Sequence, residues 1–391
     1  MRTSPRALLA GLVLLAAVPS PGQETTIAVG VRETVHSSLL NEDRRLLIYT
    51  PPGYGTGTAR YPVVYLLDGD SHFLPVSGIA EFLAGLGLSP AMIVVGIPNT
   101  NRTRDLTPGV RNDTAHQFTA SGGADLFLSF LTDELAPYIN AHYRTEPFRI
   151  LMGHSLGGLF AVHAMLHKPD SFNAYIAMSP SLWWDDRREL ETAQEFFRPG
   201  KTTFRKVFFM TLGSEGDQMQ IPAAGLAKIL AGNSPPGFTW KYVSMPEESH
   251  GTIPLKSAYE GLRFLFTGYS YPMSNADSGL AGVQRHYAAL SEKYGYRMTP
   301  PETVVNSLGY ALLGSKKAAG AIELFRYNVA TFPNSANVYD SMADGYEANN
   351  QKDLAAQNCD EACRVGEKNA DPNLALYRAH RDRLAAQKSG N

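Results

Sequence analysis

The sequence lacks the features that mark several large classes of protein. Neither sign of charge is in excess, because the chain has 35 Lys and Arg and 37 Asp and Glu. No basic surface for nucleic acid or anionic membranes is therefore expected. Only two cysteines occur, Cys359 and Cys363. Four residues apart on a helix they would share a face, where either a disulfide or the packing of two small residues fits the spacing. Neither alternative makes them catalytic.

A hydrophobic run long enough to span a bilayer is absent from the N-terminal region. The uncharged run Ala7–Val18 is shorter than the ~20 residues that a membrane helix needs. It follows Arg2 and Arg6 and precedes small residues, the pattern of a secretory signal peptide. We therefore expect cleavage near Gly22 and a periplasmic or secreted protein without a stable membrane anchor. A retained N-terminal anchor is the alternative.

Apolar runs of strand length fill much of the chain and alternate with helical patterns. Most are continuously apolar, as strands buried on both faces should be. A helical pattern over residues 124–143, interrupted by Pro137, separates two of them. The sequence therefore predicts an α/β fold with a mainly parallel sheet and helices on both faces. The predicted strands are YPVVYLLDG (61–69), AMIVVGI (91–97), FRILMG (148–153), NAYIAMS (173–179), KVFFMTLG (206–213) and TWKYVSMP (239–246), after a pair of shorter strands with a turn near residues 41–43.

The composition changes near Tyr269, where Ala-rich helical patterns replace the strand runs. Gly309–Tyr310 and Gly345–Tyr346 lie 36 residues apart (345 − 309), close to the tetratricopeptide period of about 34 residues. We expect a tetratricopeptide-like segment that docks on the main domain and offers a surface to a protein partner; a plain helical extension is the alternative. The expected divisions are 1–22 (signal peptide), 23–268 (catalytic domain), 269–300 (connection) and 301–391 (helical segment).

The stretch Gly153-His154-Ser155-Leu156-Gly157 matches the motif G-x-S-x-G, between an apolar strand and a helical pattern. In this motif a serine sits on a sharp strand-to-helix turn with its oxygen exposed. Residues two before and two after it must be small, because side chains there would collide across the turn. The context predicts that Ser155 is a nucleophile.

A serine nucleophile needs a base and an orienting carboxylate, in the chain order Ser, acid, His for this architecture. Within the predicted sheet domain His163, His167 and His250 follow Ser155. The first two lie on the helix that begins at the motif, too near in sequence to fold back onto Ser155. This leaves His250, in a polar loop after the last strand, as the predicted base.

The predicted acid is Glu215, which follows a strand in a glycine-flanked turn, with Asp217 as the open alternative. Glu247 and Glu248 lie close to His250 in sequence and are weaker candidates.

Backbone N–H groups must stabilise the oxyanion of such a reaction. Leu156 supplies one in this motif, and Gly69 or Asp70, after the first long strand, is expected to supply the other. A turn without a catalytic role is the alternative for residues 68–70. No histidine–carboxylate cluster has metal-ligand spacing in the sequence, so no metal or other cofactor is expected.

Several stretches together resemble the α/β-hydrolase putative-esterase family, which includes siderophore esterases, feruloyl and acetyl xylan esterases and S-formylglutathione hydrolases. The resemblance is closest to the periplasmic siderophore-esterase-like subgroup and covers about residues 34–267. It implies Ser155 as nucleophile, His250 as base, and N–H groups near Gly69 and at Leu156 for the oxyanion. The stretches are VVYLLDGDSHF, NTNRTRDLTP, ILMGHSLGGLFAVHAM, SPSLWW, LGSEGD and ESHGTIPLKSAYEGLRFLF.

Two groups of side chains bear on the substrate. Trp183 and Trp184, after a strand end, are expected to stack on an aromatic acyl group, with loop packing as the alternative. Arg102 is expected to bind an anionic substrate, although it and its neighbours Arg104 and Arg111 would also suit salt bridges within their own loop. The predicted activity is serine ester hydrolysis of a small molecule. A peptidase or acyltransferase on the same machinery, or a scaffold using the helical segment, is the alternative.

Overall fold

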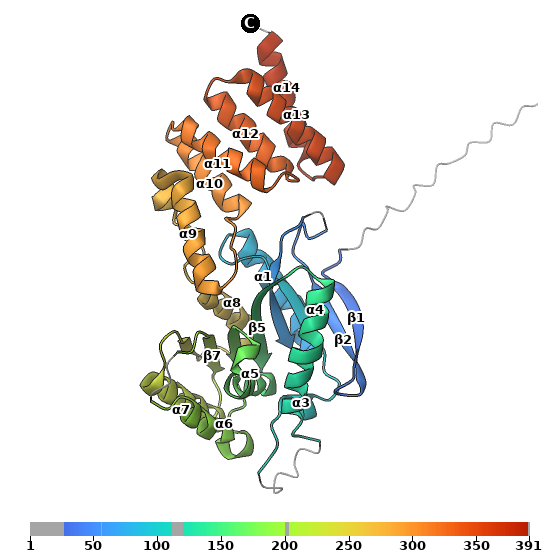
Figure 1. Ribbon diagram of the computed structural model, residues 1–391, viewed down its shortest axis with the longest axis vertical. Helices are drawn as coiled ribbons and strands as arrows, with labels where there is room; N and C mark the ends of the chain where they lie inside the picture. The colour runs from blue at the N-terminus through green and yellow to red at the C-terminus, as the bar shows by residue number, and fades with distance from the viewer. Residues whose placement is uncertain (1–26, 56, 112–119, 200–202, 390–391) are drawn as a thin grey trace, which may run out of the picture.

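An eight-stranded sheet forms the centre of the N-terminal part of the protein, and the C-terminal helices extend from one end of it (Figure 1). The computed structural model describes residues 27–389 except residues 56, 112–119 and 200–202, so the expected signal peptide lies outside the described residues. The strand order is β1-β2-β4-β3-β5-β6-β7-β8. β2 pairs antiparallel with both β1 and β4, and the strands β3 to β8 are parallel to one another. The strands are β1 (Val31–Ser37), β2 (Glu42–Tyr49), β3 (Tyr61–Leu67), β4 (Ile93–Ile97), β5 (Thr145–His154), β6 (Ala174–Met178), β7 (Val207–Gly213) and β8 (Thr239–Met245).

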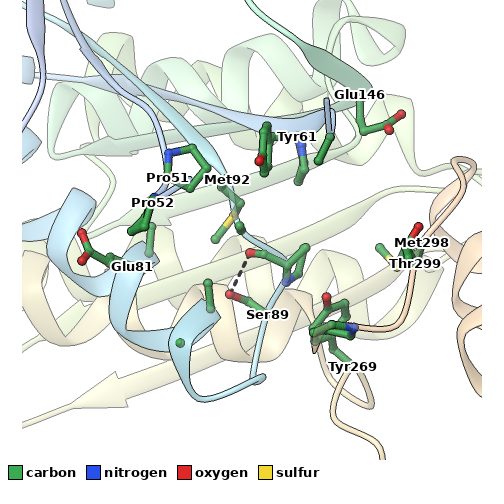
Figure 2. Close-up of a pocket in the computed structure, with 18 of the residues that line it drawn as sticks. Pro51, Pro52, Tyr61, Glu81, Ser89, Met92, Glu146, Tyr269, Met298 and Thr299 are labelled. Atoms are coloured by element: carbon green, nitrogen blue, oxygen red, sulfur yellow. Dashed lines mark hydrogen bonds between the residues drawn. The ribbon is translucent and has the colours of Figure 1, made fainter. Parts of the chain in front are cut away.

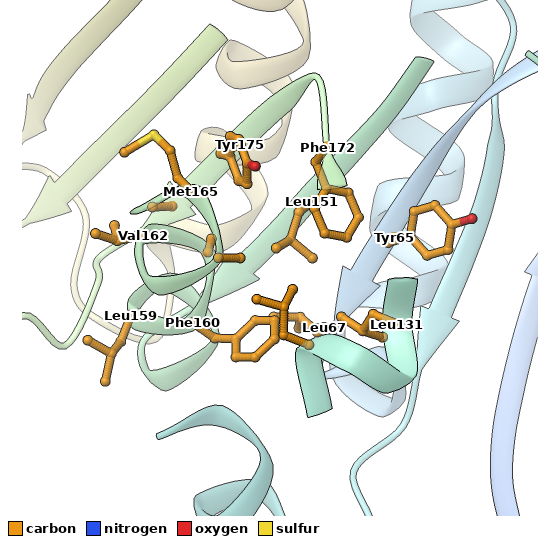
Figure 3. Packing of buried hydrophobic residues seen from close by; sticks show 14 of the residues in the cluster. Tyr65, Leu67, Leu131, Leu151, Leu159, Phe160, Val162, Met165, Phe172 and Tyr175 are labelled. Atoms are coloured by element: carbon orange, nitrogen blue, oxygen red, sulfur yellow. The ribbon is translucent and has the colours of Figure 1, made fainter. Parts of the chain in front are cut away.

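The apolar character of the central strands follows from burial on both faces, as predicted. In β3, Tyr65 and Leu67 belong to one core, while Val64 and Leu66 belong to the core on the opposite face. The first core lies beneath α3–α7, and Figure 3 shows Phe160 of α5 within it. The second core lies beneath α1 and α8. The helices of this part are α1 (Gly69–Gly85), α2 (Arg102–Leu106), α3 (Ala124–Ser129), α4 (Ala136–His142), α5 (Leu156–His167), α6 (Trp184–Phe196), α7 (Asp217–Asn233) and α8 (Ile253–Leu265), with the shorter turns η1 (Phe130–Leu135) and η2 (Pro169–Ser171).

The helix predicted over residues 124–143 is divided into three parts. A π-helical segment, η1, separates α3 from α4, and Pro137 is the second residue of α4. Proline has no N–H to donate and its ring collides with the carbonyl four residues earlier. The widened π turn is therefore the form that the predicted kink takes.

The C-terminal helices share a core with the sheet domain. Tyr294, Leu308 and Phe325 belong to the same buried cluster as Phe148 of β5, so the helical segment docks on the sheet domain (Figure 1). Within the described residues, no helix combines the length and apolar character that a membrane span requires. This segment contains η3 (Met273–Ser278), α9 (Gly279–Tyr294), α10 (Glu302–Gly314), α11 (Ala318–Thr331), α12 (Ala336–Ala348), α13 (Lys352–Asn369) and α14 (Leu374–Ser389).

The glycines of the two repeated Gly–Tyr pairs pack against the same aromatic ring. A Cβ on Gly309 of α10 would lie 2.3 Å from the Phe325 ring, and one on Gly345 of α12 would lie 3.0 Å from it. The two glycines therefore let α10 and α12 approach α11 closely, while assignment to the tetratricopeptide class stays a prediction. Cys359 and Cys363 are free and buried on α13. Of the two alternatives given from the sequence, the structure shows the packing of two small residues and not the disulfide.

Candidate active site

Ser155 lies on a sharp turn between β5 and α5. Its backbone dihedrals, φ 59° and ψ −113°, are ones that a non-glycine residue adopts only when the surrounding structure imposes them. A Cβ on Gly153 would lie 2.3 Å from the carbonyl oxygen of Gly157, so the turn excludes side chains where the motif places glycine. Two hydrogen bonds between main-chain groups, Ser155 N–H to Met178 O and Ser181 N–H to Ser155 O, hold the turn against the end of β6.

His250 lies beside this turn and contacts Glu215. The His250 Nδ1 and Glu215 Oε2 atoms are 2.7 Å apart. The imidazole also packs on the ring of His154, the residue before Ser155, with the ring centroids 4.6 Å apart. The Glu215 side chain is 6% exposed and that of His250 is 43% exposed, so a buried carboxylate orients an accessible imidazole.

The other three carboxylates considered from the sequence do not contact His250 among the described hydrogen bonds and ion pairs. Asp217 is the exposed first residue of α7. Glu247 forms an ion pair with Lys256, and Glu248 contributes its main-chain carbonyl to a bond with Ser214 N–H. The structure thus brings Glu215 to His250.

Two serines that the sequence analysis did not single out complete the surroundings. The Ser179 hydroxyl donates to Glu215 Oε1 at 2.5 Å, and Gly213 N–H donates to the same oxygen at 3.2 Å. Ser181 Oγ lies 3.2 Å from Ser155 Oγ. Both serines come from the segment SPSLWW at the carboxyl end of β6, which lies between β5 and β7. Its position after a strand was the signal available in the sequence.

The predicted oxyanion donors lie at the starts of two helices that follow adjacent strands. β3 and β5 are adjacent parallel strands, so α1, which begins at Gly69, and α5, which begins at Leu156, start at the same edge of the sheet. Amides in the first turn of a helix have no acceptor within the helix. A Cβ on Gly69 would lie 2.6 Å from Ile97 N, so this glycine is required by the close approach of β4. Asp70, the next residue of α1, is exposed.

Arg102 is paired within the protein, while its expected contact with an anionic substrate stays a prediction. Its guanidinium donates to both Asp68 oxygens, at 2.6 and 3.0 Å, and to the His154 carbonyl at 3.1 Å. Burial alone would raise the pKa of Asp68, but the hydrogen bonds from Arg102 and Asn99 lower it. Arg102 therefore joins its loop to the residue before Ser155. Arg104 and Arg111 also form salt bridges, but Arg104 reaches Glu42 of β2 and Arg111 reaches Asp185 of α6, so only the pair of Arg104 with Asp105 lies within the loop itself.

The two adjacent tryptophans have different environments. Trp184 is 3% exposed and its indole N–H donates to the Pro108 carbonyl at 3.1 Å, so the expectation that it stacks on substrate is wrong. Trp183 is half-buried and follows Ser181 by two residues. The three residues after Trp184, Asp185–Arg187, lie in the left-handed region and interrupt the first turn of α6.

His154 is held neutral between two other imidazoles. Burial first, and then the proximity of His250 and His72, lowers the pKa of His154 to about 4. Its Nε2 atom is buried without a hydrogen-bond partner among the described residues. His154 thus differs from His250 in having no carboxylate against its ring nitrogen.

A cavity of about 750 Å³ lies at the amino ends of the central strands, away from the carboxyl ends where Ser155 lies (Figure 2). Its lining includes Tyr61 and Glu146, at the amino ends of β3 and β5, together with Tyr269 and Met298 from the helical segment. Catalytic groups of parallel sheets gather at the carboxyl ends of the strands, where Ser155 lies. The cavity is therefore separate from the candidate active site.

Comparison with known proteins gives consistent matches. The sequence pattern of the family described as "Putative esterase" matches residues 37–221. The crystal structure of an IroE-like serine hydrolase from Shewanella oneidensis is 30% identical, with a TM-score of 0.68, over 76% of this chain and 98% of that one. Ferri-bacillibactin esterase BesA of Bacillus subtilis is 29% identical over 62% of this chain and 92% of its own length. The siderophore triacetylfusarinine C esterase of Aspergillus fumigatus is 34% identical over 38% of this chain, and the match spans 53% of that relative.

Proposed function

This chain belongs to the esterase family whose pattern it matches, and from that premise we propose that it is a serine esterase that hydrolyses siderophore esters through an acyl-enzyme. The observation that carries the proposal is the contact between Glu215 and His250 beside the constrained turn of Ser155. Nucleophile, base and orienting acid are the groups that such a reaction needs.

The proposed mechanism uses only groups of this chain. His250 accepts the proton of Ser155 Oγ as the oxygen attacks the ester carbonyl, and Glu215 stabilises the imidazolium through Nδ1–H. The N–H groups of Leu156 and of Gly69 or Asp70 donate to the oxyanion. Collapse of the intermediate expels the alcohol, which takes the proton from His250. Water, activated by the same imidazole, then releases the acid and regenerates Ser155.

The siderophore assignment draws on the names of the relatives, which are esterases of triacetylfusarinine C and of ferri-bacillibactin. Trp183, half-buried near Ser181, is the aromatic surface that we assign to the acyl group. Export through residues 1–22, catalysis by residues 23–268 and partner binding by residues 301–391, joined by 269–300, belong to the same proposal.

The test compares wild type with Ser155→Ala and His250→Ala on p-nitrophenyl acetate and butyrate, then on a ferric siderophore triester with the products followed by mass spectrometry. We expect turnover by wild type and its loss in both variants, by about 10⁴-fold or more. His142→Ala, which removes an exposed histidine of α4, is the matched control and should keep full activity. Equal rates in all four proteins would exclude Ser155 and His250 from the chemistry. Turnover of the p-nitrophenyl esters without cleavage of the triester would leave the esterase and reject the siderophore assignment.

A further inference from the structure

Two histidines and two carboxylates meet at the junction of α3, α5 and α6, outside the proposed catalytic groups. His163 and His167 lie one turn apart on α5 with their rings stacked at 4.2 Å. Glu189 of α6 places Oε1 3.0 Å from His163 Nδ1 and Oε2 3.5 Å from His167 Nε2. Asp125 of α3 places Oδ1 2.9 Å from the other ring nitrogen of His163.

The buried Glu189 carboxylate of this cluster needs a positive charge to compensate its own. The side chains of Glu189 and His163 are 2% and 3% exposed. Glu189 Oε2 is buried and has no hydrogen-bond partner among the described residues. A carboxylate away from water is costly unless a cation or hydrogen-bond donors compensate its charge. Glu189 Oε2 accepts none of the hydrogen bonds within the cluster and faces His167.

We propose that His163, His167 and Glu189 bind one divalent transition-metal ion, with Zn²⁺ as the preferred ion. The three donor atoms lie within 4.8 Å of one another. Two donors each bonded to a tetrahedral Zn²⁺ at about 2.0–2.1 Å lie about 3.3 Å apart. The pairs His163 Nδ1–Glu189 Oε1 and His167 Nε2–Glu189 Oε2, one from each carboxylate oxygen, are 3.0 and 3.5 Å apart.

The hydrogen bond from His163 to Asp125 is the kind of contact that orients a metal-bound histidine. A metal-bound histidine usually donates its second ring N–H to a carboxylate, which fixes the tautomer and leaves the other nitrogen free for the ion. Here His163 Nε2–H donates to Asp125, and Nδ1 points at Glu189. His167 is 35% exposed, so ions and a completing water ligand can enter from solvent.

Protons compete with the metal at this site. In the protein without an ion, burial would lower the pKa of His163, but Glu189 and Asp125 raise it. A proton on His163 therefore competes with the ion for the ring nitrogen. Because metal binding requires the neutral imidazole, the affinity must fall as the pH falls. No metal was expected from the sequence because no histidine–carboxylate cluster has metal-ligand spacing along the chain; the packing of α6 on α5 brings Glu189 to the two histidines.

The ion has a structural role. His163 is eight residues beyond Ser155 on a helix, about 12 Å along its axis, too far to touch a reacting ester. An ion at this point would join α5 to α6 just after the left-handed turn at residues 185–187, and so fix the segment that carries Trp183. Metal binding should therefore raise thermal stability.

A second cluster in the helical segment provides a matched control. Asp344 and Glu347 of α12 lie 3.6 and 3.7 Å from His380 Nε2. Arg383 donates to both oxygens of Glu347, so a cation already occupies this carboxylate. His380→Gln removes a histidine–carboxylate contact of the same kind without touching the proposed site.

The test uses the full chain, freed of metal with a chelator and titrated with ZnCl₂ in a calorimeter, and with Co²⁺ followed by visible absorption. We expect one Zn²⁺ per chain in wild type and in His380→Gln, with a higher Tm in both. His167→Gln, an exposed change, should weaken Zn²⁺ binding about 100-fold and Asp125→Asn about tenfold. Wild type without stoichiometric binding, or His167→Gln binding as tightly as wild type, would overturn the proposal. These readouts are independent of esterase activity.

Discussion

The hydroxyl of Ser179 donates to Oε1 of Glu215, while Oε2 of the same carboxylate faces Nδ1 of His250. The acid is thus held from both sides, with Gly213 N–H as a further donor. Two residues later in the same loop, Ser181 Oγ approaches Ser155 Oγ. The loop after β6 therefore positions both ends of the proposed triad.

Ser179→Ala should lower kcat about ten- to a hundredfold and leave KM nearly unchanged. A hydrogen bond to a charged group contributes about 1.5–3 kcal/mol, and its loss lets the Glu215 carboxylate turn away from His250. Steady-state kinetics on p-nitrophenyl butyrate measure the effect. Ser77→Ala, at a fully buried serine of α1, is the control. An unchanged kcat in Ser179→Ala would show that Glu215 needs no such support.

Glu215→Gln and Asp217→Asn separate the two acids that the sequence left open. Glu215→Gln should reduce kcat by about 10³- to 10⁴-fold, because an amide favours the wrong tautomer of His250. Asp217→Asn changes an exposed side chain at the start of α7 and should keep wild-type kinetics. The opposite ranking of the two rates would assign the acid to Asp217.

Arg102→Met should destabilise the fold by about 2 kcal/mol at neutral pH, because it leaves the buried Asp68 carboxylate without its guanidinium. The folded-state pKa of Asp68 lies below its usual value of 3.8, so the stabilisation is complete above that pH and is lost as the pH falls through the folded-state pKa. Denaturant unfolding at several pH values should show wild type and variant converging in acid. Arg364→Met, which breaks an exposed pair with Glu361, should change little at any pH.

His154→Gln should leave the midpoint of the acidic limb of the kcat/KM profile in place, whatever its effect on the maximal rate. The pKa of His154 is lowered to about 4, so this residue is neutral throughout the range in which a catalytic imidazole titrates. Replacing one neutral side chain by another does not change the charge beside His250. Profiles measured from about pH 5 to 9 provide the check. A displaced limb would mean that His154 titrates with the catalytic base.

Trp183→Ala and Trp184→Phe should affect different properties. Trp183→Ala is expected to raise KM for aromatic acyl esters about three- to tenfold relative to acetate, since a stacking surface is removed. Trp184→Phe leaves the Pro108 carbonyl without its buried donor and should lower the free energy of unfolding by about 1–3 kcal/mol at unchanged KM. An aromatic-to-acetyl KM ratio in Trp183→Ala equal to that of wild type would remove Trp183 from the acyl site.

The features that the sequence determined by itself are those fixed by neighbours along the chain. Continuous apolar runs predicted the central strands, because burial on both faces leaves no polar positions. The turn at Ser155 was predictable since the strand, the two glycines and the helix are contiguous, and the collision that excludes a side chain at Gly153 involves Gly157, four residues away. His250 followed from position, because few histidines lie after Ser155 in the predicted domain.

Only the tertiary structure decided which distant side chains meet. Glu215 and Asp217 differ by two residues in sequence, and the direction of the β7 turn alone brings the first to His250. Arg102 and Trp184 are partnered by groups 34 and 76 residues away, which no local pattern in the sequence reveals. In the same way α6 places Glu189 against the histidines of α5. Local patterns set backbone conformation and burial, whereas the pairing of charged and polar groups depends on how the helices pack across the sheet.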